Sequence, residues 1–226
     1  MTPDDLLARL EASADPEKAA RMAAYHKAPR RYLGVGNPVL DALARDLRPA
    51  TDAATRVALA AGLWEMDIHE TRILAAKLLT QSRIRPDDTP AWELIRSWVP
   101  GFDGWAVADH AAMAGGRRLV ARPERLDEIE PWVVSDHLWT ARAALTFTLP
   151  WTKQRHPKPE ELEARERILG WAARIAERRD WFLQKAVAWW LRDLSRRDPD
   201  RTRAWLETHG DRLKPFARKE AARHLP

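Results

Sequence analysis

The sequence predicts an all-α fold, and three observations support this prediction. Helical periodicity of apolar residues recurs along nearly the whole chain of 226 residues. No segment alternates apolar and polar residues in the way of a strand that leads into a glycine-bearing hairpin turn. The 16 prolines therefore mark the ends of helices.

Thirteen segments carry the helical pattern, and together they leave only short connections. In chain order they are Asp4–Glu11, Pro16–Lys27, Pro38–Leu47, Asp52–Glu65, His69–Ser82, Ala91–Trp98, Gly104–Val120, Pro123–Trp132, Asp136–Leu149, Pro159–Glu177, Trp181–Arg196, Pro199–Thr208 and Pro215–Leu225. Three starts combine a capping side chain with a proline at the first helical position: Asp15-Pro16, Asn37-Pro38 and Asp198-Pro199.

The spacing of these helices gives the architecture. About a dozen helices in one chain make a helix pair roughly every 35–40 residues, as in HEAT-like or armadillo-like α-solenoids. We expect one domain over residues 1–226, with about six helix pairs and a basic concave face that suits an extended partner such as a duplex. The residues of Thr152–Pro159 predict an exposed basic loop.

Composition excludes several classes of protein. The absence of Cys rules out disulfides and thiolate chemistry, and fits a reducing compartment. The seven His show no paired ligand spacing, so we expect no metal and no cofactor. The N-terminus lacks the apolar region of a secretory signal, and no apolar run approaches the ~18 residues of a membrane span. These features predict a soluble cytoplasmic protein without membrane contact.

The charge balance is compatible with nucleic acid. Lys and Arg number 38 against 33 Asp and Glu, which gives a net charge of +5 and a pI near 9.8. Most of the cations are arginine, whose planar donors match phosphate groups.

Trp105 and Asp109 stand four residues apart, so on a helix they share a face. An indole attracts cations, and a carboxylate beside it supplies negative charge or accepts a proton. The pair suits a reaction that develops positive charge, such as the loss of a base from a sugar. The alternative is a half-buried packing residue next to a solvated charge.

A second segment interleaves cations with an indole along one helical stripe. The stripe consists of Lys185, Trp189, Arg192 and Arg196, and the apolar residues Trp181, Leu191 and Leu194 are expected in the core. Such a stripe is typical of surfaces that follow a nucleic-acid backbone. A packed Trp on an ordinary amphipathic face is the alternative.

Two further features complete the set. Arg142 has Leu138 and Leu145 on its own side of a helix, and an arginine in apolar surroundings needs a partner. That partner is a structural carboxylate, Asp109 or a phosphate. Near the N-terminus, Tyr25-His26-Lys27 predicts a helix end, and Tyr32-Leu33-Gly34-Val35 a glycine-bearing turn.

Over nearly its whole length the chain resembles the AlkD-type DNA glycosylases of the DNA alkylation repair family, which are HEAT-like α-solenoids. The matching motifs are Tyr25-His26-Lys27, Arg31-Tyr32-Leu33-Gly34-Val35-Gly36-Asn37-Pro38, Leu63-Trp64-Glu65, Gly104-Trp105-Ala106-Val107-Ala108-Asp109, Trp139-Thr140-Ala141-Arg142-Ala143-Ala144, Gln184-Lys185-Ala186-Val187-Ala188-Trp189 and Arg218-Lys219-Glu220-Ala221-Ala222-Arg223-His224-Leu225. Each motif is short, but their order and spacing together are specific.

The resemblance implies an active site on this chain. The family's active-site residues fall on Trp105, Asp109, Arg142, Trp189 and Tyr25. Of these we expect Trp105, Asp109 and Trp189 to be catalytic and Arg142 and Tyr25 to contact DNA. Lys27, Lys185 and Arg192 are expected to add further DNA contacts. The sequence departs from the family's pattern in a longer Thr152–Pro159 loop and in Trp190 beside Trp189. The doublet leaves open which indole faces DNA, and the Lys185 and Arg192 stripe favours Trp189.

The implied activity is hydrolysis of the N-glycosidic bond of cationic alkylpurines, such as 3-methyladenine and 7-methylguanine, in duplex DNA without base flipping. The implied enzyme is a monofunctional glycosylase that acts as a monomer without an obligate protein partner. The alternative is a non-catalytic HEAT-like solenoid that binds DNA or serves as a protein-interaction scaffold. A lyase is disfavoured, because no lysine stands out as a Schiff-base nucleophile.

Overall fold

The computed structural model describes residues 1–225, and the chain divides into two compact units. Unit 1 is Met1–Arg118, and unit 2 begins at Leu119. The prediction of a single domain over residues 1–226 stays a prediction, because compactness alone does not show whether either unit folds without the other. No helix in the described part of the chain is both long and apolar enough to cross a membrane.

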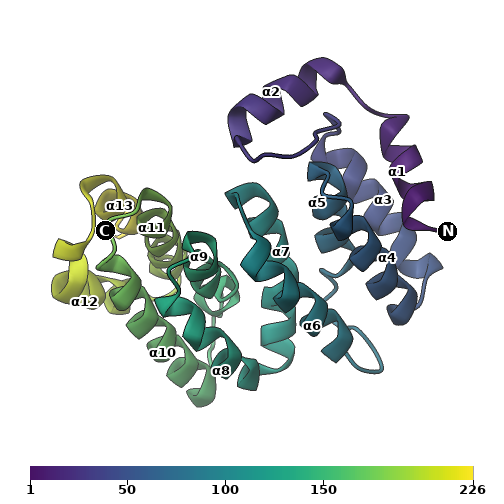
Figure 1. Ribbon diagram of the computed structural model, residues 1–226. Helices are drawn as coiled ribbons and strands as arrows, with labels where there is room; N and C mark the ends of the chain where they lie inside the picture. Colours follow the sequence, from purple (N-terminus) through teal and green to yellow (C-terminus); the bar gives the residue numbers. More distant parts are fainter. Residues whose placement is uncertain (226) are drawn as a thin grey trace. The chain divides into compact units, whose positions relative to one another are not determined.

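Unit 1 is a layered packing of helices (Figure 1). Its elements are α1 (Pro3–Glu11), α2 (Pro16–His26), α3 (Asn37–Ala50), α4 (Ala53–Glu65), α5 (His69–Leu78), α6 (Thr89–Trp98), the 3-10 turn η1 (Val99–Gly101) and α7 (Trp105–Ala121), whose last turn crosses the boundary. Helix α5 packs against α3 and α4, and α4 also contacts α1 and α6. Helix α2 stands apart, and none of its 11 residues, all of them described, is buried.

Unit 2 is built around α11. Its elements are η2 (Pro123–Arg125), α8 (Leu126–Ile129), η3 (Glu130–Val134), α9 (Leu138–Thr146), η4 (Leu149–Thr152), α10 (Pro159–Ala176), α11 (Trp181–Ser195), α12 (Pro199–His209), η5 (Gly210–Arg212) and α13 (Pro215–Ala221). Helix α11 contacts α9, α10, α12 and α13. It buries Leu183, Val187, Trp190 and Leu194 completely, at the spacing of one helical face.

The prediction of an all-α fold is confirmed: residues 1–225 contain no strand, only an isolated bridge between Arg31 and Ile68. The predicted continuous helix Pro123–Trp132 is wrong, since this stretch forms η2, α8 and η3. Pro131 lacks an N–H, and its ring blocks the carbonyl four residues before it, so the helix cannot run through. Helix α5 ends at Leu78, short of the predicted Ser82, where Arg48 and Thr80 bond the carbonyl of Lys77.

Two of the three predicted caps are confirmed. An Asp15 carboxylate oxygen accepts the N–H of Lys18 at 3.0 Å, and one of Asp198 accepts the N–H of Arg201 at 3.1 Å. The prediction for Asn37 is wrong, because Gly36 is the N-cap of α3 and Asn37 is already helical. The exposed cations of Thr152–Pro159 confirm the predicted basic loop, in which Lys153, Arg155 and Lys158 face solvent.

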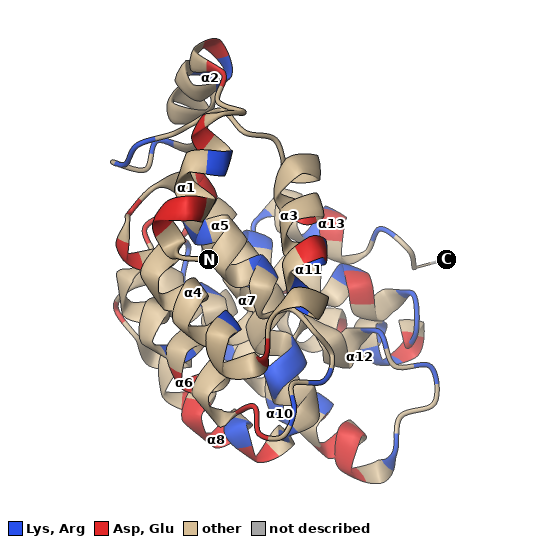
Figure 2. Cartoon of the chain, turned by 90° about the vertical axis from the view of Figure 1, so that its right-hand side faces the viewer, with Lys and Arg blue, Asp and Glu red and all other residues tan. Residues whose placement is uncertain are grey.

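Acidic and basic residues are interspersed along the helices of each unit (Figure 2). Many arginines join packed elements through carboxylates. These pairs include Arg118 with Asp88, Arg165 with Asp198, Arg167 with Asp127 and Glu130, and Arg201 with Glu166. A large share of the arginine content is therefore structural.

Glu70 fixes the turn that follows α2. Its carboxylate is fully buried and accepts three backbone N–H groups, from Leu33 at 2.9 Å, Gly34 at 2.8 Å and Val35 at 3.2 Å. Gly34 has a φ of 80°, and a Cβ there would lie 2.1 Å from the carbonyl oxygen of Asp15. Only glycine fits this predicted glycine-bearing turn.

We predict that Glu70→Gln lowers the free energy of unfolding by about 2–4 kcal/mol, since an amide offers one acceptor oxygen where three buried N–H groups need acceptors. Urea denaturation measures the change. Glu65→Gln, on the exposed end of α4, is the matched control and should change stability by less than about 0.5 kcal/mol. Equal stability of the two variants would show that the turn does not depend on this carboxylate.

Candidate functional site

Helix α7 begins at Trp105 and carries Asp109 one turn later. The three residues between them, Ala106, Val107 and Ala108, are buried, whereas Trp105 and Asp109 are each partly exposed. Both side chains therefore lie on the outer side of the first turns of α7, as the helical spacing predicts. A carboxylate and an aromatic ring thus lie on one surface of unit 1.

The predicted N-terminal aromatic, Tyr25, contacts Trp105. Their ring centroids are 5.8 Å apart with the planes at 88°, an edge-to-face arrangement. Tyr25 is 68% exposed, so this contact lies at the surface. Lys27 follows in a left-handed conformation with φ of 57° and ends α2, with its side chain exposed. The structure therefore brings Tyr25, Lys27 and Trp105 to one region of unit 1.

A cluster of three rings lies next to this contact. The ring centroid of His26 lies 5.1 Å from that of Trp105, 4.7 Å from that of His69 and 6.1 Å from that of Tyr32, and Tyr32 stacks on His69 at 4.7 Å. His26, His69 and Trp105 also line a small pocket at the start of α7. His69 could not be predicted as part of this cluster, because its partners are distant in the sequence and only its place at the start of a helical segment was visible.

This ring cluster is uncharged at neutral pH. Burial, which has the largest effect, together with the neighbouring His26, Arg30 and His110 lowers the pKa of His69 from 6.5 to about 3. Burial also lowers the pKa of His26. Positive charge near the cluster comes instead from Arg30, which is ion-paired with Asp103 and Asp67.

In unit 2, Arg142 is 2% exposed within the buried stretch Thr140–Thr146 of α9. One of its Nη atoms donates to the backbone carbonyl of Phe182, at 2.9 Å. This carbonyl adds to the carboxylate or phosphate that the sequence predicts as a partner of Arg142, and that partner stays a prediction. Arg142 thereby holds the first turn of α11 against α9.

The core position predicted for Trp181 is wrong. Trp181 is 46% exposed at the first position of α11, after the N-cap Asp180. Lys185 lies over its ring, with Nζ 4.7 Å from the centroid. The indole that accompanies Lys185 is thus Trp181, and the core positions predicted for Leu191 and Leu194 are confirmed.

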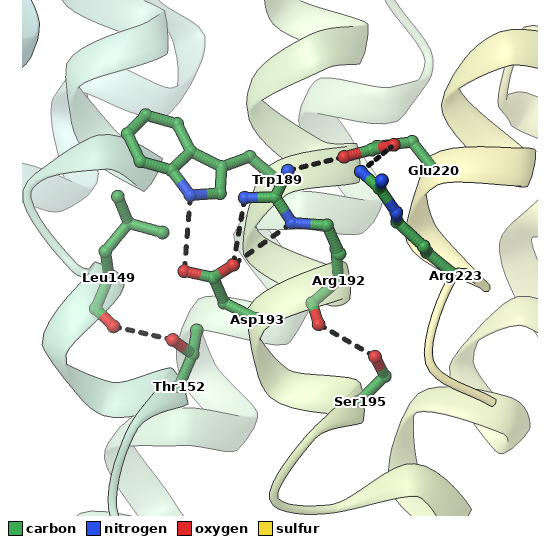
Figure 3. Close-up of polar contacts among 8 residues, drawn as sticks. All are labelled: Leu149, Thr152, Trp189, Arg192, Asp193, Ser195, Glu220 and Arg223. Atoms are coloured by element: carbon green, nitrogen blue, oxygen red, sulfur yellow. Dashed lines mark hydrogen bonds and ion pairs between the residues drawn. The ribbon is translucent and has the colours of Figure 1, made fainter.

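Trp189 is partly buried, and its Nε1 donates to Asp193 at 3.2 Å (Figure 3). Its neighbour Trp190 is fully buried, so Trp189 is the more exposed indole of the doublet. Arg192 is bound by Asp193 and by Glu220 of α13. Two carboxylates therefore partly neutralise Arg192, which the sequence predicts to contact DNA.

A comparison with protein families decides the identity. The family model described as "DNA alkylation repair enzyme" matches residues 6–225. The chain belongs to this family. Membership implies a role in DNA repair and binding to DNA.

Solved structures share the fold. A predicted DNA alkylation repair enzyme from Enterococcus faecalis is 19% identical with a TM-score of 0.77, and the match covers 94% of this chain and 96% of that one. AlkD2 from Streptococcus mutans is 20% identical with a TM-score of 0.62, over 93% and 98% of the two chains. The protein smu.31 from Streptococcus mutans is 21% identical with a TM-score of 0.61, over 84% and 92%.

These likenesses confirm the predicted HEAT-like fold. The predicted basic concave face stays a prediction. Among curated proteins, none matches the chain.

We predict that His69 makes unit 1 sensitive to acid. Because its folded pKa of about 3 lies below the unfolded 6.5, the unfolded state binds more protons between these values, and stability is lost as pH falls through them. This one group contributes a slope of up to ~1.4 kcal/mol per pH unit. Unfolding free energies measured between these pH values test the slope.

The variant His69→Phe keeps a ring in the stack and cannot be protonated, so its stability should depend less steeply on pH. His156→Phe, in the exposed loop, is the control and should retain the wild-type slope. An unchanged slope in His69→Phe would contradict the buried neutral histidine.

Proposed function

We propose that this family member hydrolyses the N-glycosidic bond of cationic alkylpurines, such as 3-methyladenine and 7-methylguanine, in duplex DNA without flipping the base. The observation that carries the proposal is the placement of Trp105 and Asp109 on the outer side of the first turns of α7, with Tyr25 against the indole. Family membership supplies the DNA substrate.

The chemistry needs few groups. An alkylated base that carries a positive charge leaves as a neutral molecule, so the enzyme needs no general acid. Ordinary glycoside hydrolysis uses two carboxylates, and here one is sufficient. Asp109 stabilises the oxocarbenium charge that develops on the sugar, and it positions or deprotonates the attacking water. The face of Trp105 lies along the cationic sugar.

Two neighbouring rings support the indole of Trp105. Tyr25 contacts it at 88°, and His26 contacts it at a tilt of 52°. Because these neighbours hold the ring before DNA arrives, its electrostatic effect requires little reorganisation. Tyr25 and Lys27 are exposed, and in this proposal they contact the DNA backbone.

For the second indole, the geometry of unit 2 favours Trp181 over the Trp189 of the sequence prediction. Trp181 is more exposed than Trp189, and Lys185 lies over its ring. It directly precedes Phe182, whose backbone carbonyl accepts a hydrogen bond from Arg142. Trp189 has its N–H committed to Asp193. In this proposal Arg142 positions α11, Lys185 meets phosphate, and Arg192 contributes less because two carboxylates hold it.

The proposed enzyme acts as a monomer in the cytoplasm, at the nucleoid when it is bound to DNA. A non-catalytic DNA-binding solenoid or protein scaffold is the alternative, and the experiments below separate it from an enzyme.

We predict that Asp109→Asn lowers excision at least about tenfold, which is ~1.4 kcal/mol of barrier, because the amide keeps the shape and loses the charge. Affinity for duplex DNA should persist. Chromatography of bases released from methylated duplex DNA gives the rate, and Asp46→Asn on the surface of α3 is the matched control.

The same assay includes a duplex that carries uracil or 1,N6-ethenoadenine. These neutral lesions should stay in place, since their departure needs protonation or a base pocket. Comparable release of cationic and neutral lesions would sink the single-carboxylate mechanism, and absence of any release by the wild-type protein would favour the scaffold.

We also predict that Trp181→Ala lowers excision by at least about tenfold, whereas Trp189→Ala lowers it by less than about threefold. Each variant removes one indole from α11, so each serves as the control for the other. Thermal unfolding checks that both variants fold. The opposite ranking would restore Trp189 as the indole of α11 that acts in excision.

A further inference from the structure

Two exposed rings meet at the surface of unit 2. Trp181 at the start of α11 stacks on Phe216 at the start of α13, with centroids 5.7 Å apart and planes at 27°. Trp181 is 46% exposed and Phe216 is 37% exposed. Phe182 contacts the Trp181 ring at 88° and supports it. Large aromatic side chains in contact and open to water are typical of a binding surface.

A basic hollow adjoins Phe216. Phe216, Lys219, Glu220 and Arg223 line it, and their spacing of three or four residues places them on one side of the chain from α13 onward. Lys219 and Arg223 are exposed. Across the aromatic pair, Lys185 lies over the face of Trp181. Cations therefore lie on both sides of the rings.

Glu220 and Asp193 do not cancel this charge. Glu220 contacts both Arg192 and Arg223, and Asp193 contacts Arg192 (Figure 3). Arg192 and Arg223 contact these two carboxylates, whereas Lys185 lies over Trp181 and Lys219 lines the hollow. The four cations and two carboxylates sum to +2 for these six residues. The carboxylates hold the guanidinium groups in place, and the surplus is available to an anion.

We propose that this surface, made of Trp181, Lys185, Phe216, Lys219 and Arg223, binds an unpaired nucleotide of a DNA strand. The base stacks on Phe216 beside Trp181, and the phosphates on either side meet Lys219 with Arg223, and Lys185. A duplex buries the faces of its bases, so exposed rings find a base to stack on only where a nucleotide is unpaired. Rings flanked by cations match single-stranded DNA in both shape and charge.

The test measures binding of a fluorescently labelled oligothymidylate of about ten nucleotides, a length in the range of one single-strand site. The same strand annealed to its complement provides the duplex comparison. Phe216→Leu removes the ring and keeps apolar bulk, and it should lower single-strand affinity about tenfold while duplex affinity changes less than about twofold. Leu162→Ala, at an exposed apolar position of α10, is the control and should change neither.

Lys219→Gln provides a second measurement that does not depend on the ring. It should reduce the salt dependence of single-strand binding by roughly one phosphate contact, a change of ~0.7 in the log–log slope, and Lys153→Gln should leave that slope unchanged. Single-strand affinity that Phe216→Leu leaves intact, or an equal loss on the duplex, overturns the proposal. Absence of single-strand binding by the wild-type protein also overturns it. The oligonucleotide carries no lesion, so these outcomes are independent of excision.

Discussion

The geometry of the candidate site in unit 1 depends on one buried carboxylate. Glu70 gathers the N–H groups of Leu33, Gly34 and Val35, and the carbonyl of Leu33 in turn accepts the N–H of Asp15 at 2.9 Å. Helix α2 buries none of its residues, so its own packing cannot fix it. The turn ties the start of α2 to α5 through Asp15, and the N–H of His69, donated to the carbonyl of Arg31 at 3.0 Å, ties the segment after α2 to α5. These bonds restrict where α2 lies and so favour the contacts of Tyr25 and His26 with Trp105.

An uncharged cluster of rings supports the indole on the side of the protein interior. His69 is 3% exposed and contacts both His26 and Tyr32, which also lie 6.1 Å from each other, and protonation of His69 would place a charge in a poorly solvated site near the Arg30 guanidinium. The neutral form of His69 is therefore the stable one. A rigid π face beside a carboxylate is the arrangement that stabilises a developing cation without reorganisation at the moment of reaction. The turn held by Glu70 and the rings beside Trp105 therefore support the two residues of α7 to which we assign the chemistry.

The sequence predicts features that depend on residues close together in the chain, and it misses contacts between residues that are far apart. The caps Asp15 and Asp198, the shared face of Trp105 and Asp109, and the helices themselves follow from neighbours within one turn, so periodicity found them. Trp181 failed as a core residue for a geometric reason. Helical side chains lean over the preceding turn, and the first residue of a helix has no preceding turn to cover. Its ring instead meets Phe216, from a helix more than thirty residues later in the sequence.

Many arginines of this chain have structural contacts, so the number of basic residues alone does not locate a DNA-binding surface. The basic composition predicts phosphate contacts, yet Arg118, Arg142 and Arg165 are buried among carboxylates and carbonyls, where they join helices. A guanidinium has five donors in a planar fork, so it can bridge several backbone and carboxylate acceptors at once. Lysine cannot do this as well, and Lys27, Lys185 and Lys219 are exposed. In this chain the search for DNA contacts should therefore begin with exposed lysines that lie beside aromatic rings, because the number of arginines mainly reflects how the helices are held together.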